Sequence, residues 1–279
     1  MTSKHEKRLQ RQLELEQQEL ERQQAKENKR QQKLMAQQER PVNGPVDCAC
    51  LIHGKGYDWQ YVEKLYNMLN RSLTGGVRFH VYTEHDRSVP PHMNKHILDE
   101  WPIEAGPRSS WWYKIQLFDP AKFDGNLLYL DLDTVIARNL DWIRGLSTKY
   151  FWAPKDFRRL WRNNHRGINS SVMWWDTRRC SWIWEDFLNK EMMQTTRKFY
   201  GDQEYLSSIL DDKLRRYLPE ERIQSWRWEI KDGGMDFKRR IYLKPGQGTC
   251  LQPNTDVLIF HGRPKPHEVR DDVINQNWC

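Results

Sequence analysis

Two apolar runs that flank an amphipathic segment limit the fold of this chain more than any other feature. The runs cover residues 46–52 and 77–83, and between them residues 57–73 place apolar side chains about four positions apart. Short apolar runs are typical of buried strands, and a spacing near four is typical of a helix with one buried face. Gly75 and Gly76 separate this helix from the second strand. We therefore predict a strand–helix–strand unit, which places two parallel strands in one sheet.

The remainder of the chain continues the alternation of strands and helices. Further strands are predicted at 127–130, 150–153, 168–175, 224–230, 240–244 and 257–260, and helices at 111–118, 181–190 and 202–212. Ser109 or Ser110 is expected to cap the first of these helices. Sheets of this kind are covered by helices on both faces and bind ligands beyond the carboxyl ends of their strands. The predicted fold class is therefore α/β, with a sheet flanked by helices on both faces.

The first forty residues differ in composition from the rest. Residues 1–40 hold ten Gln, ten Lys or Arg and seven Glu, with almost no branched or aromatic side chains. Such a segment cannot bury enough apolar surface to offset the entropy lost on ordering, so we expect a solvated or coiled-coil-like helix. Two prolines and a glycine at 41–45 predict a linker. The expected organisation is a charged, Gln-rich helical tail at 1–40, available for oligomerisation or tethering, a linker at 41–45 and one folded domain at 46–279.

The charge and the cysteine content exclude several classes of protein. The formal net charge is +7, of which the tail supplies +3. This balance suits a phosphate-bearing small molecule and does not indicate nucleic-acid binding. The five cysteines are odd in number and form no CxxC pair, so we predict neither a disulfide framework nor a zinc site. No apolar run is long enough to span a membrane and the first residues have no signal-peptide core, so a cytoplasmic protein is expected.

The segment that says most about chemistry is 127–133, Leu-Leu-Tyr-Leu-Asp-Leu-Asp, in which an apolar strand ends in two carboxylates. Residues i and i+2 of a strand point to the same side, so Asp131 and Asp133 can face one cation that also binds diphosphate oxygens. Mg²⁺ and Mn²⁺ prefer such oxygen ligands. Aspartates after a strand are also common as turn formers, and that alternative stays open for this motif taken alone.

A second class of enzyme shares this motif. Residues 131–135, Asp-Leu-Asp-Thr-Val, fit the DxDx[TV] loop of haloacid-dehalogenase-type phosphatases, with Asp131 as nucleophile. That class has its loop after the first strand of the domain and a later GDxxxD pair. Here two predicted strands precede the loop, and the GD pair that ends in Asp202 has Leu206 at the last acidic position. These differences weigh against the phosphatase alternative.

Near the C-terminus another strand opens into a segment rich in polar groups. Residues 257–260 are apolar and are followed by His261, Gly262, Arg263 and Lys265. A neutral imidazole can complete a metal shell, a glycine lets the backbone approach a phosphate, and cations neutralise the phosphate charge. The segment therefore predicts a diphosphate clamp. Taken alone, a partly buried histidine followed by chain-terminating prolines would explain it as well.

These motifs and their neighbours resemble, in order, the glycogenin-like glycosyltransferases, a retaining family with the GT-A fold. The resemblance covers most of residues 46–267. Besides the two segments above, it rests on the elements at 56–57, 112–118, 153–156, 168–172 and 201–203. They are similar to the family's donor-stacking tyrosine turn and its K-L-x-x-F, A-P-D, F-N-S-G-V and G-D-Q motifs. The fold class that the resemblance implies is α/β, with a GT-A-type, Rossmann-like mixed sheet flanked by helices.

The resemblance implies a role for each matching residue. The implied ligands of Mn²⁺ or Mg²⁺ are Asp131, Asp133 and His261; the implied donor-binding residues are Tyr57, Asp156, Asn169, Ser170, Gly262 and Lys265; the implied catalytic residues are Asp202, Gln203 and Lys114. The implied reaction is the transfer of a sugar from a nucleotide-sugar donor, expected to be a UDP-sugar, to an unknown acceptor with retention of configuration. A non-catalytic sugar- or nucleotide-binding protein of the same fold is the remaining alternative.

The chain departs from the family pattern at three positions. His261 directly precedes Gly262 instead of standing three residues before it, Ser171 replaces a glycine, and His267 replaces a tryptophan, which indicates a distant branch. The aromatic and basic stretch 151–166 could bind an acceptor or cover the site, although core packing explains its tryptophans nearly as well. Other tryptophans are expected in the core and not at a sugar site, namely Trp111, Trp174, Trp175, Trp182 and Trp184.

Overall fold

The structure is a computed structural model. It describes residues 44–101, 109–160, 162, 165–190, 192–230, 235–236, 241–242 and 251–279. The predicted tail at 1–40, most of the linker and most of the strand predicted at 240–244 lie outside the described residues.

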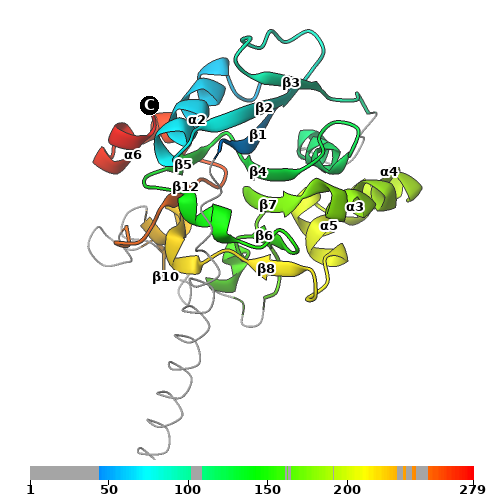
Figure 1. Cartoon of the computed structure of the whole chain (residues 1–279). Helices are drawn as coiled ribbons and strands as arrows, with labels where there is room; N and C mark the ends of the chain where they lie inside the picture. The colour runs from blue at the N-terminus through cyan, green and yellow to red at the C-terminus, as the bar shows by residue number, and fades with distance from the viewer. Residues whose placement is uncertain are drawn as a thin grey trace, which may run out of the picture. The chain divides into compact units, whose positions relative to one another are not determined.

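Seven strands form one mixed sheet (Figure 1). In chain order they are β1 (Val46–Ile52), β2 (Val77–Thr83), β3 (Asn94–Ile97), β4 (Asn126–Leu130), β6 (Phe151–Ala153), β7 (Val172–Asp176) and β8 (Arg215–Tyr217). Their order across the sheet is β3-β2-β1-β4-β7-β6-β8. Strands β3, β2, β1 and β4 are parallel, β7 is antiparallel to β4 and β6, and β8 is parallel to β6. The mixed sheet that the sequence predicts is confirmed.

A three-stranded sheet continues from the end of β4. Three residues separate the end of β4 from β5 (Thr134–Ile136). β5 pairs antiparallel with β12 (Val257–Ile259), and β12 pairs in parallel with β9 (Ile223–Ser225). In this register Thr134 lies opposite Ile259. Asp131 and Asp133 therefore lie in the link between two sheets, and the chain that leaves β12 starts beside them. A separate two-stranded pair consists of β10 (Met235–Asp236) and β11 (Ile241–Tyr242).

Helices follow most of the strands. The α-helices are α2 (Trp59–Ser72), α3 (Thr177–Asn189), α4 (Met192–Lys198), α5 (Asp202–Ile209) and α6 (Asp272–Asn277). Shorter helical segments are η1 (Ser109–Phe118), η2 (Asp141–Gly145), η3 (Phe157–Leu160), η4 (Glu220–Arg222), η5 (Trp226–Ile230) and η7 (Pro266–Glu268). Asp58 accepts a hydrogen bond from the backbone N–H of Gln60, so α2 begins two residues later than predicted.

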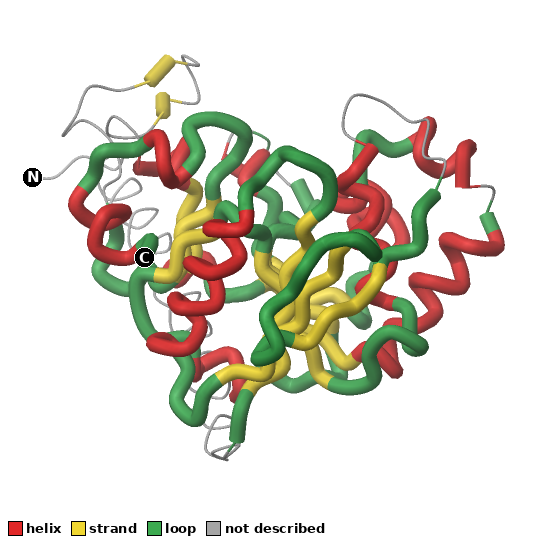
Figure 2. The backbone as a smooth tube through the Cα atoms, turned by 90° about the horizontal axis from the view of Figure 1, so that it is seen from above, coloured by secondary structure: helices red, strands yellow, loops and turns green. Residues whose placement is uncertain are grey.

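Both faces of the large sheet are covered (Figure 2). On one face Leu127 and Tyr129 of β4 pack in a single core with Trp112 of η1 and Phe187 of α3. Because successive strand residues point to opposite faces, Leu128 points the other way, and it is fully buried too. Figure 2 shows helices on either side of the strands, as the alternating pattern predicts.

Some local predictions are wrong. η1 is a 3-10 helix that already includes Ser109 and Ser110, so neither serine caps it from outside. The strand predicted at 224–230 ends at Ser225, and the chain continues as the π-helix η5. The strand predicted at 168–175 begins only at Val172. The short elements β3, β5, β8, α4 and α6 were not predicted, because three to seven residues carry too little periodicity to be recognised.

The predicted core tryptophans divide into three groups. Trp174 and Trp175 are buried, as predicted, and Trp182 and Trp184 are partly buried against the same core. Trp111 is 37% exposed, so its assignment to the core is wrong. Trp112 is 1% exposed, and adjacent residues lie on different faces of a helix, so only one of the two rings faces the core.

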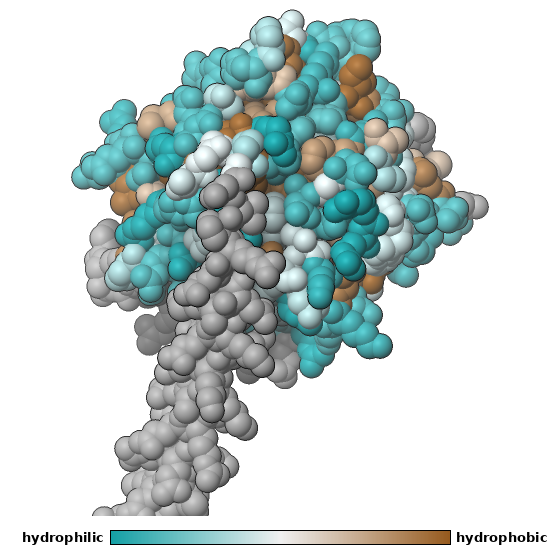
Figure 3. All heavy atoms as spheres, viewed as in Figure 1, coloured by the Kyte–Doolittle hydropathy of each residue, from teal (hydrophilic) through white to brown (hydrophobic). Residues whose placement is uncertain are grey.

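On the face seen in Figure 3, apolar side chains of the described residues lie in small groups between polar ones. Small scattered groups of this kind are ordinary on a protein surface. Within the described residues, every helix is too short or too polar to cross a membrane.

Candidate functional site

Asp131 lies at the centre of a partly buried ion-pair cluster directly after β4, with its side chain 23% exposed. Its Oδ1 is 2.7 Å from Nζ of Lys114 and accepts a 2.7 Å hydrogen bond from Oη of Tyr129. Lys114 extends from η1 and also lies 3.8 Å from Oδ2 of Asp202 and 3.5 Å from Oγ of Ser170. The predicted residues Lys114, Asp131, Ser170 and Asp202 thus converge, and we refer to them as the Asp131 cluster.

Burial and charge oppose one another in the Asp131 cluster. Burial raises the pKa of Asp131, but the charge and hydrogen bond of Lys114 outweigh this effect and hold the pKa below its usual value. Burial lowers the pKa of Lys114, but Asp131 and Asp202 together raise it above its usual value. For Asp202, burial outweighs Lys114 and the pKa is raised. Lys114 and Asp131 therefore form a charged pair. Oδ2 of Asp202, in contrast, has no hydrogen-bond partner among the described residues.

Asp133 belongs to a second cluster with different partners. Its Oδ2 accepts a 2.8 Å hydrogen bond from Oη of Tyr57 and a 2.5 Å hydrogen bond from Nζ of Lys265. Nζ of Lys265 also donates to Oη of Tyr57 at 2.6 Å. Tyr57 follows β1 and Lys265 follows β12, so the register between β5 and β12 brings together residues far apart in the chain. We refer to Tyr57, Asp133 and Lys265 as the Asp133 cluster.

The pKa of Asp133 moves in the opposite direction from that of Asp131. Burial raises it, Lys265 lowers it, and the nearby charge of Asp131 raises it again, so the net pKa lies above the usual value. Burial and the charge of Asp133 also raise the pKa of Tyr57, which stays a neutral hydrogen-bond donor. The two aspartates therefore repel one another across the link between the sheets.

The side-chain amide of Gln203 is held from several sides. Its Oε1 accepts hydrogen bonds from Nδ2 of Asn169 at 3.1 Å and from the backbone N–H of Ser170 at 3.4 Å. Its Nε2 donates to Oδ2 of Asp156 at 3.2 Å. Gln203 is the second residue of α5, directly after Asp202. The predicted residues Asp156, Asn169, Ser170 and Gln203 therefore form one network that touches the Asp131 cluster through Ser170.

Asp156 is surrounded by protein donors. Its Oδ1 accepts from the backbone N–H of Arg158 at 2.9 Å, and its Oδ2 lies 2.7 Å from Nε of Arg158 and 2.9 Å from Nε2 of His165. The resemblance implies that Asp156 binds hydroxyls of the donor sugar. In this structure its oxygens face Arg158, His165 and Gln203, so its observed action is to orient Gln203.

His261 lies close enough to the two clusters for the charges of Asp131 and Lys265 to act on its imidazole. Its ring packs edge-on against Phe157 with centroids 4.9 Å apart, and its buried Nε2 has no hydrogen-bond partner among the described residues. Burial lowers the pKa of His261 to about 4, although the charges of Asp156 and Asp131 act to raise it, so the imidazole is neutral near pH 7. Gly262 follows with φ of 68°, a left-handed conformation that favours glycine.

The residues present suit a hard divalent cation in charge and in ligand type. The two clusters contain three carboxylates, from Asp131, Asp133 and Asp202, but only two ammonium groups. A neutral imidazole nitrogen without a partner, such as Nε2 of His261, is a common metal ligand. Among the described residues, no three His, Cys, Asp or Glu side chains are close enough together to hold a metal ion. Metal binding by Asp131, Asp133 and His261 therefore stays a prediction.

Several contacts of this region were not predicted, although Arg158 and His165 lie in the aromatic and basic stretch 151–166. Tyr129 could have been found, because it lies two residues before Asp131 on the same side of the strand. Arg158 follows Asp156 by two residues and also had a local signal. His165 gave none, because its contact with Asp156 depends on the path of the chain between them.

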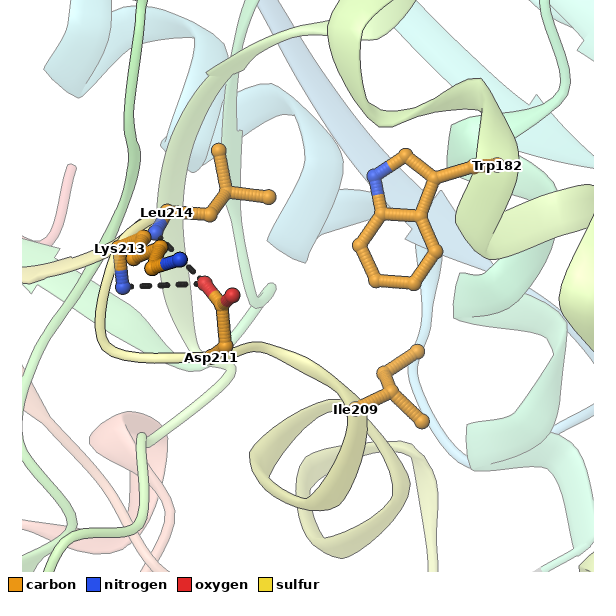
Figure 4. A pocket seen from close by; sticks show the side chains of 5 residues that line it. All are labelled: Trp182, Ile209, Asp211, Lys213 and Leu214. Atoms are coloured by element: carbon orange, nitrogen blue, oxygen red, sulfur yellow. Dashed lines mark hydrogen bonds between the residues drawn. The ribbon is translucent and has the colours of Figure 1, made fainter.

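A pocket of about 390 Å³ lies at the other end of α5 (Figure 4). It is lined by Trp182, Ile209, Asp211, Lys213 and Leu214. Oδ1 of Asp211 accepts hydrogen bonds from the backbone N–H groups of Lys213 and Leu214, which hold the loop that follows α5. Its lining includes none of the predicted site residues, which gather instead near the first residues of α5 and the link after β4.

Comparison with solved structures identifies the type of fold. No family model and no curated protein matches this chain. Solved structures do match it. The galactosyltransferase LgtC in complex with donor and acceptor sugar analogs has a TM-score of 0.56 at 13% identity, over 79% of this chain and 89% of LgtC. The apo form of the glycosyltransferase GlyE of Streptococcus pneumoniae TIGR4 has a TM-score of 0.55 at 14% identity, over 84% of this chain. The apo bifunctional glycosyltransferase WbbM has a TM-score of 0.54 at 12% identity, over 86% of this chain.

At these identities the similarity shows the fold. This chain has the GT-A-type, Rossmann-like α/β fold of those glycosyltransferases, and the predicted fold class is confirmed. The matches cover 63% of GlyE and 50% of WbbM, so the chain spans less than two thirds of either protein.

Proposed function

We propose that this chain is a metal-dependent glycosyltransferase that moves a sugar from a nucleotide-sugar donor, a UDP-sugar, with retention of configuration. One observation carries the proposal: Lys114, Asp131, Asp133, Asp202 and Lys265 converge at the link between the two sheets of a GT-A-type fold. The neighbouring solved structures, all of glycosyltransferases, and the motif order of the glycogenin-like family support the same activity.

In this proposal Asp131, Asp133 and the neutral His261 hold Mn²⁺ or Mg²⁺. Such an ion stabilises the negative charge of a departing diphosphate as a Lewis acid. Nζ of Lys265 donates to Oδ2 of Asp133, so Lys265 can bind a donor phosphate only by exchanging this partner. Lys265 releases Asp133 and binds a phosphate oxygen, while Gly262 lets the backbone approach the same group. The ring of Tyr57 meets Tyr61 edge-on, with centroids 4.8 Å apart, and lies 4.9 Å from Nζ of Lys265. In this proposal the same movement of Lys265 frees one face of the ring for stacking on the base.

The Asp131 cluster and its neighbours would act on the leaving group and the sugar. Lys114 is a buried ammonium already in place, so it stabilises developing negative charge without a reorganisation of solvent. Within the part of the chain that the structure describes, Oδ2 of Asp202 has no hydrogen-bond partner, so it can accept a hydrogen bond from a sugar hydroxyl. Oε1 of Gln203 already accepts two hydrogen bonds, from Asn169 and Ser170. In this proposal the remaining N–H of Gln203 binds the donor sugar, and its amide lies near the anomeric carbon.

The variant Asp133→Asn tests the proposal. It removes one charge and one metal ligand, and we expect metal-dependent donor turnover to fall at least about 100-fold, as when one group that stabilises a transition state is lost. Turnover is measured with Mn²⁺ and a panel of nucleotide sugars. Asp256→Asn is the matched control, because Asp256 is equally buried and ion-paired, 2.7 Å from Arg222, but precedes β12 at its opposite end. It should retain wild-type turnover.

Other outcomes distinguish the alternatives. A phosphatase would release phosphate from p-nitrophenyl phosphate and lose that activity in Asp131→Asn. A non-catalytic binding protein would be stabilised by a nucleotide in a thermal melt yet hydrolyse no donor. Stabilisation by UDP alone would identify the base. If no nucleotide raises the melting temperature with or without Mn²⁺, the assigned donor site is wrong.

A further inference from the structure

Two exposed aromatic side chains, Trp111 and Tyr200, form a pair at the surface. Trp111 is 37% exposed and Tyr200 is 58% exposed, and their rings meet edge to face with centroids 5.9 Å apart. A single exposed apolar residue is ordinary, but large aromatic rings normally gain free energy by burial. Two such rings held side by side at the surface therefore suggest a ligand that covers them.

The pair adjoins the residues assigned to catalysis. Side chains three residues apart lie on the same face of a 3-10 helix. Trp111 and Lys114 therefore share one face of η1, about 6 Å apart along its axis. Tyr200 comes two residues before Asp202. The ring of Trp111 also packs closely over Gly201, where an added Cβ would lie 3.3 Å from a ring carbon. Both rings are thus anchored to the segments that carry Lys114 and Asp202.

Charged groups border the pair. The backbone N–H of Tyr200 donates to Oε2 of Glu204 at 3.0 Å, and Oε1 of Glu204 lies 3.3 Å from Nη1 of Arg158. The side chains of Glu204 and Arg158 are 37% and 31% exposed, so a ligand can reach both. Arg158 in turn holds Asp156, which holds Gln203. A continuous set of contacts therefore connects the aromatic pair with Gln203, the residue that the proposed function places near the anomeric carbon.

We propose that Trp111 and Tyr200 form the acceptor subsite and that the acceptor presents a pyranose ring there. A pyranose has an apolar C–H face and a rim of hydroxyls, which match an aromatic face bordered by a carboxylate and a guanidinium. This inference rests on the proposed glycosyltransferase function.

In the transfer, the bond between the anomeric carbon of the donor sugar and its diphosphate oxygen breaks. A bond from the same carbon to an acceptor hydroxyl oxygen forms, and the hydroxyl proton passes to the departing diphosphate. The subsite acts by stacking one face of the acceptor on Trp111, while Glu204 and Arg158 orient its hydroxyls toward the donor.

The test separates transfer from donor hydrolysis. Full-length protein with Mn²⁺ and its active nucleotide sugar is assayed without acceptor and with the methyl glycosides of glucose, galactose, mannose and N-acetylglucosamine. In Trp111→Leu and in Tyr200→Ala, we expect the ratio of transfer to hydrolysis to fall about tenfold, the usual effect of losing one stacking ring. Trp111→Tyr should restore most of the ratio. Ile97→Ala removes a side chain of similar exposure, 46%, from the edge strand β3, and should leave the ratio unchanged.

Saturation-transfer NMR with the same glycosides measures binding directly, and thermal melts verify that each variant is folded. If Trp111→Leu does not fold, the more exposed Tyr200 decides the question. Equal ratios in the wild type and the folded variants, or a wild type that binds none of the glycosides and glycosylates only a peptide, would overturn the subsite. A wild type that neither binds nor hydrolyses any nucleotide sugar would overturn the proposed function instead.

Discussion

Asp131 and Asp133 stand two residues apart but belong to regions of different construction. Asp131 is paired with Lys114 and Tyr129, and its pKa lies below the usual value, because these partners outweigh its burial. Asp133 is paired with Lys265 and Tyr57, and its pKa lies above the usual value, because burial and the charge of Asp131 outweigh its partners. The anionic form is therefore stabilised at Asp131 and destabilised at Asp133.

The origin of the partners explains the difference. The Asp131 cluster draws on η1, β4 and α5, elements packed on the core of the large sheet. The Asp133 cluster draws on the segments after β1 and after β12, which meet only because β5 and β12 pair. We infer that the Asp131 cluster is preorganised and that the Asp133 cluster is where an incoming donor and cation exchange partners with Lys265.

The largest expected effect concerns the two lysines. Lys114→Met leaves the buried carboxylate of Asp202 and the partly buried carboxylate of Asp131 without their ammonium, and we expect the free energy of unfolding to fall by about 3 kcal/mol. Lys265 is more exposed, 24% against 11%, so Lys265→Met should cost roughly 1–2 kcal/mol. Urea denaturation of both variants measures the difference. Equal losses would contradict the distinction between a preorganised and an exchangeable cluster.

A pH effect of intermediate size is expected at His261, which senses the charge of Asp131. Its folded pKa of about 4 lies below the unfolded value of about 6.5, so the unfolded chain binds a proton first as the pH falls. Stability should therefore drop between pH 6.5 and pH 4, by at most roughly 3 kcal/mol from this group. Metal-free His261→Gln should lack that part of the drop in urea denaturation at several pH values. His85→Gln, at a side chain 81% exposed, should keep the wild-type profile.

The smallest expected effect comes from two tyrosine hydroxyls. Tyr57→Phe removes the hydrogen bond to Asp133, and Tyr129→Phe removes the matching one to Asp131; each should cost about 1 kcal/mol of stability. Because each hydrogen bond lowers the pKa of its aspartate, both pKa values should rise, and NMR titration of the carboxyl carbons follows them. Donor KM should increase several-fold more in Tyr57→Phe than in Tyr129→Phe. The opposite order would place donor exchange at Asp131.

Much of the fold could be predicted because its signals are local. β1, α2, β2 and β4 have apolar periodicities that each extend over one segment, and Asp58 marks the start of α2 by its own capping bond. β3, β5 and β8 could not be predicted, since three or four residues acquire strand geometry only from the neighbours with which they pair. The exposure of Trp111 was missed because two adjacent tryptophans carry no periodicity that shows which of them faces the core.

The candidate site divides in the same way. The sequence by itself determined that Asp131 and Asp133 follow a buried strand, that Lys114 lies on a preceding helical segment and that Asp202 and Gln203 open a helix. Only the tertiary structure decided that Lys265 meets Asp133 and Tyr57, that Arg158 and His165 surround Asp156, and that Trp111 and Tyr200 meet at the surface. The physical reason is that secondary structure follows from neighbours along the chain, whereas ion pairs and ring contacts depend on how distant segments pack.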